Sequence, residues 1–182
     1  MIPDPDTPQL IPPVHEGDHT LGPASAPVTL VEYGDYECPF CGAAQPSVRE
    51  VLRIAGDSIL FAFRHFPLSE IHPHATLAAE AAEAAGAQGR FWQMHELLFA
   101  NQHALTPANL VTYAAVIGCD VDQFTADLEE HRFSAVVREH FLSGLRSGVN
   151  GTPTFFVNGV RHDGGYDVPS LLNSITLAGA PA

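Results

Sequence analysis

The chain has 182 residues, 46% of them apolar, and carries 8 basic against 21 acidic residues, for a net charge of −13. This length and apolar content fit one domain with a sizeable core and room for an inserted subdomain. The negative charge argues against nucleic acid and anionic membrane surfaces as partners, because both are polyanions that bind clusters of lysine and arginine.

The sequence also argues against a membrane segment. No apolar run approaches the roughly 18 residues of a membrane helix. The first residues, Met1–Asp6, lack the positive and apolar regions of a signal peptide. We therefore expect the chain as it stands to be cytoplasmic, whereas a form from which a leader had been removed would be periplasmic or exported.

The first third of the chain predicts a β-α-β unit. Residues 1–25 contain six prolines and are expected to form an extended or flexible arm. Val28–Tyr33 is β-branched and apolar, which favours a buried strand. A helix is expected from Pro39 to about Ala55, because proline suits a first helical position. A second strand should follow at 58–66.

Helices and then strands are expected in the rest of the chain. Helical spacing predicts helices at 75–85, 91–99, after the Thr106 cap, after the Asp120 cap and at 133–145. Strands at 154–157 and 160–162 flank Asn158-Gly159, a strong hairpin signal. Asp167 should cap a last helix through Leu177. The order indicates an α/β domain with helices inserted in its middle.

The chemistry is concentrated in Cys38-Pro39-Phe40-Cys41, at the predicted start of a helix. Unpaired N–H groups and the positive end of the helix dipole favour a thiolate at Cys38. Cys41, one turn along, could attack a mixed disulfide at Cys38 and release the substrate. A half zinc site is the competing interpretation, but no second cysteine pair completes a four-thiolate set. The pattern predicts a redox pair.

Two further positions have two possible interpretations each. Glu32, six residues before Cys38, could turn inward and exchange a proton with the Cys41 thiol, or be an exposed glutamate of an edge strand. Pro153 could simply begin a strand, or could follow a cis peptide bond after Thr152.

These residues resemble the DsbA-like oxidoreductases of the thioredoxin fold. The resemblance covers about residues 20–178 and is carried by Glu32, the CPFC motif, Phe63–Leu68 and the Gly151–Gly159 segment. It implies a thioredoxin-like core at 26–66 and 149–180, interrupted by a helical subdomain at 67–148.

The same resemblance implies roles for individual residues. The family carries an acidic residue at the position of Glu32, which favours the proton relay. It implies a cis bond between Thr152 and Pro153, in a loop that packs against the cysteine pair and binds a substrate peptide along its backbone. Pro39 and Phe40 would face the same groove.

One departure affects the expected redox strength. The family's best-known strong oxidant has histidine just before the second cysteine, where this chain has Phe40. Phenylalanine offers no hydrogen bond or positive charge to a thiolate. We therefore expect an intermediate or reducing couple rather than a strong oxidant.

The leading hypothesis is an enzyme that exchanges disulfides with protein or peptide thiols and is recycled by an unidentified redox partner. It needs no cofactor or metal, and we expect a monomer. A glutathione-dependent transferase or isomerase of the kappa type is one alternative, although such enzymes typically use serine-type chemistry. A non-catalytic peptide-binding or chaperone module is the other.

Other reactive side chains are expected to be structural. Cys119 is interpreted as a small, partly buried apolar residue. His65 is expected to pack in the core or at the surface. His72-Pro73-His74 is not expected to bind a metal, because no carboxylate or cysteine completes a plausible set.

Overall fold

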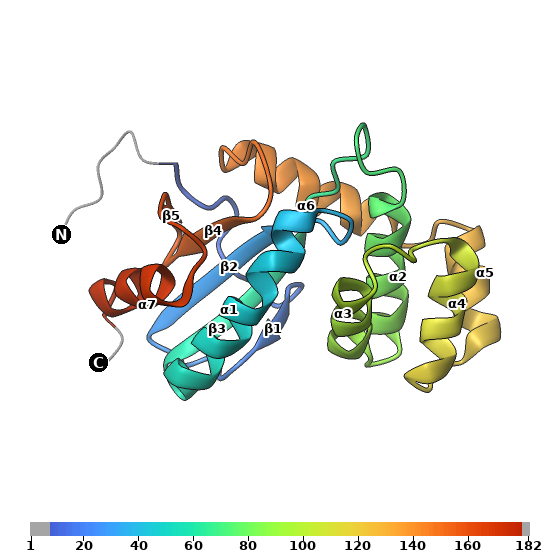
Figure 1. Cartoon of the computed structure of the whole chain (residues 1–182), viewed down its shortest axis with the longest axis horizontal. Helices are drawn as coiled ribbons and strands as arrows, with labels where there is room; N and C mark the ends of the chain where they lie inside the picture. The colour runs from blue at the N-terminus through green and yellow to red at the C-terminus, as the bar shows by residue number, and fades with distance from the viewer. Residues whose placement is uncertain (1–7, 180–182) are drawn as a thin grey trace. The chain divides into compact units, whose positions relative to one another are not determined.

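The structure is a computed structural model that describes residues 8–179 (Figure 1). In chain order its strands and helices are β1 (His19–Leu21), β2 (Val28–Gly34), α1 (Pro39–Ala55), β3 (Ile59–His65), α2 (Ala75–Ala87), α3 (Phe91–Ala100), α4 (Pro107–Val116), α5 (Val121–Glu129), α6 (Ser134–Arg146), β4 (Thr154–Val157), β5 (Val160–His162) and α7 (Val168–Leu177). None of the helices within these residues combines the length and the apolar character that crossing a membrane requires.

The strands form one sheet in the order β1-β3-β2-β4-β5. The pairs β1–β3, β2–β4 and β4–β5 are antiparallel. The neighbours β2 and β3 are joined through α1, the connection expected of a β-α-β unit. The predicted α/β thioredoxin-like fold with a helical insertion is confirmed, and β1 is a strand that the sequence did not predict.

Two compact units divide the chain. Within the described residues, the first contains 8–34, Ala43–Arg64 and 142–179; the second contains Asp35–Gly42 and His65–Phe141. The second unit overlaps the predicted 67–148 insertion, but it also includes 35–42, which we assigned to the core. The reason is that this loop hydrogen-bonds to residues of the helical segment, as described below.

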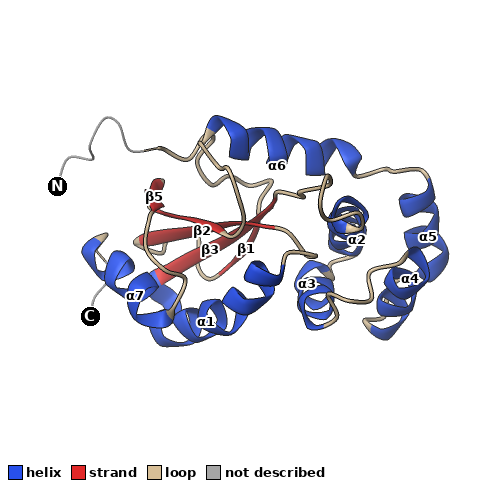
Figure 2. Ribbon diagram, turned by 45° about the horizontal axis from the view of Figure 1, so that its top comes forward, coloured by secondary structure: helices blue, strands red, loops and turns tan. Residues whose placement is uncertain are grey.

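The first unit is built around the two central strands. β2 and β3 are buried at nearly every position. α1 and α7 lie on the same face of this sheet (Figure 2). Asn158 and Gly159 have φ values of 47° and 79°, which the tight turn between β4 and β5 requires. The predicted hairpin is therefore confirmed.

The second unit is centred on α2, which packs against α3, α4 and α5. Small side chains make this close packing possible. The buried alanines of α2 are Ala75, Ala78, Ala79, Ala81, Ala82, Ala84 and Ala85. Asp120 caps α5 by accepting from the Gln123 N–H at 3.0 Å, as predicted. Thr106 stands at the N-cap of α4 without a side-chain cap bond, so Pro107 at the first position is the stronger start signal there.

The N-terminal arm supplies the edge strand at one end of the sheet and pairs with the edge strand at the other. β1 pairs with β3 at one edge. At the other edge Gln9 bridges Val160 of β5, and the Leu10 N–H donates to the Gly159 carbonyl at 2.8 Å. Exposed sheet edges are templates for aggregation, and here one edge strand is short, with three residues, while the other is paired with the arm. Over its described part, residues 8–25, the arm is therefore extended but bound to the sheet; residues 1–7 lie outside the described residues.

A buried arginine holds the arm as it crosses between the two edges. The Arg64 side chain is 1% exposed. Its Nε and Nη2 donate to the two carboxylate oxygens of Asp18 at 2.8 Å each. Nη1 donates to the Pro12 carbonyl at 2.9 Å and to the Tyr33 hydroxyl at 3.1 Å, and Nη2 donates to the Pro13 carbonyl at 3.0 Å. This one guanidinium therefore joins β3, β2 and three points of the arm.

The first prediction concerns this ion pair. Burial raises the pKa of the Asp18 carboxyl, but the hydrogen bonds and charge of Arg64, with the His15 backbone N–H, outweigh burial and hold this pKa below its usual value of 3.8. At neutral pH, Asp18→Asn should lower the free energy of unfolding by about 3 kcal/mol, because it leaves the buried guanidinium uncompensated. Urea unfolding measures the loss.

The pH dependence checks the cause. A carboxyl whose pKa is lower in the folded state contributes its full stabilisation when the pH is above its pKa in the unfolded chain. This stabilisation is lost as the pH falls through the pKa of the folded state. The difference between the wild type and Asp18→Asn should therefore shrink at acidic pH. Glu50→Gln, which breaks the exposed pair with Arg53, is the matched control and should change stability little. Equal effects of both substitutions would contradict the prediction.

Candidate functional site: the cysteine pair and the loop that holds it

The cysteine pair stands at the N-terminus of α1, where the sequence predicted it. Cys38 directly precedes the helix, and the Gly42 N–H donates to the Cys38 carbonyl at 3.1 Å. Cys38 is 3% exposed and Cys41 is fully buried, whereas Phe40 between them is 62% exposed. The helix N-terminus favours an anion at Cys38. An exposed apolar side chain therefore stands directly beside an almost fully covered sulfur.

Asp35 organises the loop before the motif. Its carboxylate is 2% exposed and accepts from the Glu37 N–H at 2.8 Å, the Leu68 N–H at 2.9 Å and His72 Nδ1 at 2.7 Å. Its own N–H donates to Cys41 Sγ at 3.5 Å. Asp35 therefore fixes the loop and also places a donor on the second sulfur, where it favours a thiolate. Sequence reasoning missed this residue.

The two histidines of the His-Pro-His segment serve the same loop. His72 binds Asp35, and His74 binds Glu37 through its N–H at 2.6 Å and through Nδ1 at 2.8 Å. No carboxylate was expected to complete a metal set with these histidines; the structure gives each of them a separate carboxylate partner, 37 residues earlier in the chain. Each histidine binds a different carboxylate, so the two histidines hold the 35–37 loop at two separate points and do not form one shared cluster.

Gln102, which follows α3, holds the backbone of the motif through two hydrogen bonds. Its Nε2 donates to the Tyr36 carbonyl at 2.9 Å and to the Cys38 carbonyl at 2.7 Å. The space it occupies exists only because position 42 is glycine: a Cβ there would lie 2.1 Å from Gln102 Oε1. Gly42 and Gln102 are thus a matched pair, and neither was singled out from the sequence.

Tyr36 fixes the same loop from within the second unit. Its side chain is 1% exposed, its hydroxyl lies 3.1 Å from His95 Nδ1, and its ring contacts those of His65 and Phe99 at centroid distances of 5.8 and 4.8 Å. His65 at the end of β3 and Phe99 of α3 therefore support the residue two positions before Cys38.

The remaining predicted site residues belong to the first unit. Glu32 is fully buried on the central strand β2, and both of its carboxylate oxygens accept from Gln45 Nε2 at 3.3 Å. The interpretation of Glu32 as an exposed edge-strand residue is therefore wrong. The Thr152–Pro153 peptide bond is cis, and both residues are partly exposed at the entrance to β4. The predicted site thus divides into cysteines and their flanks in one unit and Glu32, Thr152 and Pro153 in the other.

Cys119 has a different environment from the motif cysteines. It is partly exposed at the C-terminal end of α4. Burial raises the pKa of its thiol, and the positive charge of Arg90 only partly opposes this. A thiol with a raised pKa is a poor nucleophile at neutral pH. This agrees with the structural interpretation of Cys119.

Comparison with known proteins gives a consistent result. Residues 15–175 match the family model Thioredoxin_4, described as thioredoxin. The structure is similar to that of oxidised BdbD from Bacillus subtilis, with a TM-score of 0.84, 25% identity and coverage of 94% of this chain and 96% of that one. It is also similar to a thioredoxin-like oxidoreductase from Silicibacter pomeroyi, with a TM-score of 0.81, 26% identity and coverage of 92% and 95%.

Curated relatives place a similar sequence inside longer proteins. The chain is 48% identical to a Na⁺/H⁺ antiporter NhaA 1 of Salinispora arenicola, over 93% of this chain and 26% of that protein. It is 43% identical to an NhaA antiporter of Herminiimonas arsenicoxydans, over 91% of this chain and 27% of that protein. The chain therefore spans about a quarter of the length of these relatives.

The second prediction tests the Gly42–Gln102 pair by a double-mutant cycle. Gly42→Ala should lower the free energy of unfolding by about 1 kcal/mol: displacing Gln102 loses two hydrogen bonds of about 1 kcal/mol each, and alanine returns up to about 1 kcal/mol of helix propensity. In a Gln102→Ala background the same substitution should stabilise the protein by up to about 1 kcal/mol. Urea unfolding of the four proteins measures the coupling.

A matched control keeps the interpretation specific. His103→Ala removes an exposed neighbour of Gln102 and should leave the sign of the Gly42→Ala effect unchanged. An effect of Gly42→Ala that is the same with and without Gln102 would show that the two residues act independently.

Proposed function

The chain belongs to the DsbA-like thioredoxin family, and from that membership we propose that it is a thiol–disulfide oxidoreductase that exchanges disulfides with protein substrates through Cys38 and Cys41. The observation that carries the proposal is the placement of this pair at the N-terminus of α1, with a donor from the Asp35 backbone on the second sulfur. Helix-terminal N–H groups favour a thiolate at the first position and thereby a nucleophile.

The exchange proceeds in two substitutions at sulfur. The Cys38 thiolate attacks one sulfur of a client disulfide, the client S–S bond breaks, and the other client sulfur leaves as a thiolate that takes up a proton. The Cys41 thiolate then attacks Cys38 in the mixed disulfide and releases the second client thiol. Two electrons pass from the cysteine pair to the client, and the reverse sequence oxidises a client dithiol.

Glu32 is proposed to accept the proton of Cys41 before the second step. Support comes from its full burial on the strand that leads into the motif, because a carboxyl held away from water is suited to exchanging a proton near neutral pH. Gln45 holds both of its oxygens and so fixes the carboxylate's orientation.

Client binding is proposed to use Phe40, Pro39 and the Thr152-Pro153 segment. Phe40 is the exposed apolar side chain beside the nucleophile, and Pro39 is exposed next to it. Because Phe40 offers no proton donor to a thiolate, the couple is proposed to be intermediate or reducing rather than strongly oxidising.

A second candidate is favoured by the curated relatives. They carry the similar sequence as about a quarter of a Na⁺/H⁺ antiporter. On this candidate the domain serves one fixed membrane transporter rather than a range of protein thiols. The identity of the trapped clients, described next, decides between the two.

The third prediction concerns the two cysteines. Cys38→Ser should abolish disulfide exchange, measured as insulin reduction and as oxidation of a dithiol peptide. Cys41→Ser should instead accumulate a mixed disulfide, because the resolving sulfur is gone. Mass spectrometry of the trapped species identifies the clients: many soluble proteins support the leading proposal, and a single membrane transporter supports the second candidate.

Cys119→Ser is the matched control and should keep full activity. Activity that survives in Cys38→Ser would contradict a cysteine mechanism and favour glutathione-dependent chemistry of the kappa type. If the wild type shows no disulfide exchange at all and Cys38→Ser still binds clients, the result would favour the peptide-binding module. Failure of the wild-type pair to form a disulfide in any glutathione buffer would overturn the proposal.

The fourth prediction concerns Glu32. Glu32→Gln keeps the size of the side chain and its capacity to bind Gln45 but removes the base. Release of a client from the mixed disulfide at neutral pH should slow by about 100-fold, at the low end of what general acid–base catalysis contributes, and should recover at high pH, where the thiol ionises unaided. Stopped-flow single-turnover kinetics measure this step. The exposed Glu70→Gln is the control, and an unchanged rate in Glu32→Gln would remove Glu32 from the mechanism.

A further inference from the structure

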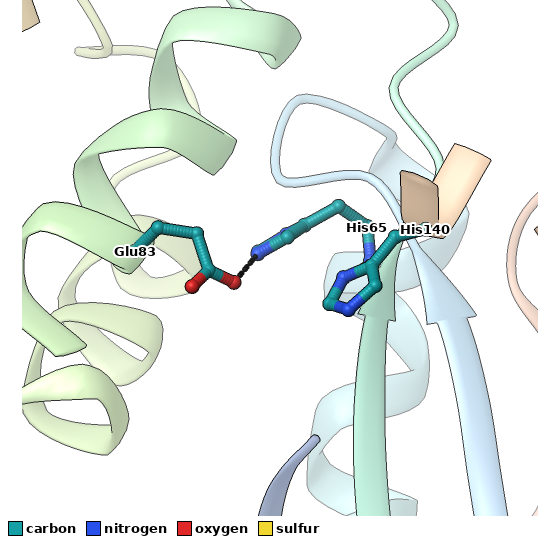
Figure 3. Close-up of side chains that lie close together, drawn as sticks. All are labelled: His65, Glu83 and His140. Carbon is teal, nitrogen blue, oxygen red and sulfur yellow. Dashed lines mark hydrogen bonds and ion pairs between the residues drawn. The ribbon is translucent and has the colours of Figure 1, made fainter. Parts of the chain in front are cut away.

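Three buried side chains in the second unit converge on one point away from the cysteine motif. They are His65 at the end of β3, Glu83 in the middle of α2 and His140 on α6 (Figure 3). One donor atom from each lies within 4.8 Å of the other two. His65 is 1% exposed, and Glu83 and His140 are 6% exposed each. The thiol chemistry proposed above uses none of them.

The two histidines differ in what they present to this point. His65 Nε2 faces a Glu83 carboxylate oxygen, which can only accept, so Nε2 carries a proton that it must release to bind a metal. His140 Nδ1 accepts from the His65 backbone N–H at 3.4 Å. A backbone N–H can only donate, so Nδ1 carries a lone pair. The contact is long for a hydrogen bond, so ligation by Nδ1 would give up a weak bond and leave the His65 backbone N–H without this acceptor. The two imidazole rings are stacked with their centroids 5.4 Å apart, and Figure 3 shows them next to one another.

Glu83 contributes the negative charge. Its Oε1 lies 2.8 Å from His65 Nε2, and it approaches from α2 toward the two rings (Figure 3). Buried carboxylates in proteins are paired or coordinate metals, because an isolated charge is costly to remove from water. On its present contacts this carboxylate faces two imidazoles, which are both established ligands of divalent transition metals.

We propose that His65, Glu83 and His140 bind one divalent transition-metal ion, zinc foremost, through His65 Nε2, His140 Nδ1 and a Glu83 carboxylate oxygen. Two histidines and a glutamate are a known three-ligand set for zinc, and they leave a fourth position for water. Zinc–nitrogen and zinc–oxygen distances of about 2.0–2.2 Å place tetrahedral ligands about 3.4 Å apart. The distance between His65 Nε2 and Glu83 Oε1 must therefore increase by about half an ångström. The longer distances from His140 Nδ1 to the other two donor atoms must decrease.

Binding would tie together three segments of the second unit that are distant in sequence. The end of β3, the centre of α2 and α6 each supply one ligand. The His65 ring also contacts Tyr36, two residues before Cys38. The inference nevertheless stands apart from the redox proposal, because it rests on no cysteine.

The fifth prediction is tested in a protein without thiols, since thiolates bind zinc strongly. The full chain carrying Cys38→Ser, Cys41→Ser and Cys119→Ser is dialysed against chelator and titrated with zinc by calorimetry and with cobalt by absorption spectroscopy. We expect one equivalent of either metal, a raised melting temperature with zinc, and tetrahedral cobalt bands without a thiolate charge-transfer band. No binding at micromolar zinc would overturn the proposal.

Ligand variants locate the site. Glu83→Gln keeps the shape and can still bind His65, so the fold should survive, but zinc affinity should fall at least about 100-fold, since even second-shell changes cost 10- to 100-fold. His140→Gln is the second variant and should weaken zinc equally. His95→Gln removes another buried histidine of the same unit, one bonded to Tyr36, and should leave affinity unchanged. Equal affinity in all three variants would place the ion elsewhere and overturn the assignment.

Discussion

The buried guanidinium of Arg64 is the constraint on which the first unit depends. A charge with almost no exposure must be matched, and here Asp18, two arm carbonyls and the Tyr33 hydroxyl match it. Replacing a buried ion pair by apolar groups is often neutral, so the pair is poor evidence for extra stability. Its consequence is positional: the arm must cross at this point, and from there it reaches both edges of the sheet.

A second set of buried polar contacts sets the position of the cysteines. The loop from Asp35 to Gly42 belongs to the helical unit because Asp35, Glu37 and the Cys38 carbonyl all find their partners there. The helix that follows continues into the sheet unit. Cys38 therefore lies where a rigid helix begins and where a hydrogen-bonded loop ends. Such a position combines the electrostatic advantage of a helix N-terminus with a fixed backbone.

Local signals made most of the fold predictable. The β-branched run at 28–33, the Asn158-Gly159 turn and the Asp120 and Asp167 caps each act over a few residues, and the structure contains them all. The missed features are contacts between residues far apart in the chain. Asp35 with His72 and Gln102 with the Cys38 carbonyl are separated by 37 and 64 residues. No periodicity or turn chemistry records such a pairing, so β1, the hydrogen bonds of Gln102 and those that hold the 35–37 loop could not be read from one sequence.

The cysteine pair could compete with the His65–Glu83–His140 set for zinc only while both of its thiols are reduced. Zinc prefers thiolates, but the motif offers just two sulfurs, and zinc generally requires three or four protein ligands. When Cys38 and Cys41 form a disulfide, neither sulfur can bind zinc as a thiolate. The donor atoms of His65, Glu83 and His140 do not change with the redox state. The reduced pair would need further ligands to bind zinc. The third cysteine of the sequence, Cys119, lies after the end of α4 and not beside the pair. If the thiols serve exchange as proposed, the buried His-Glu-His set is therefore the chemically consistent place for a resident ion.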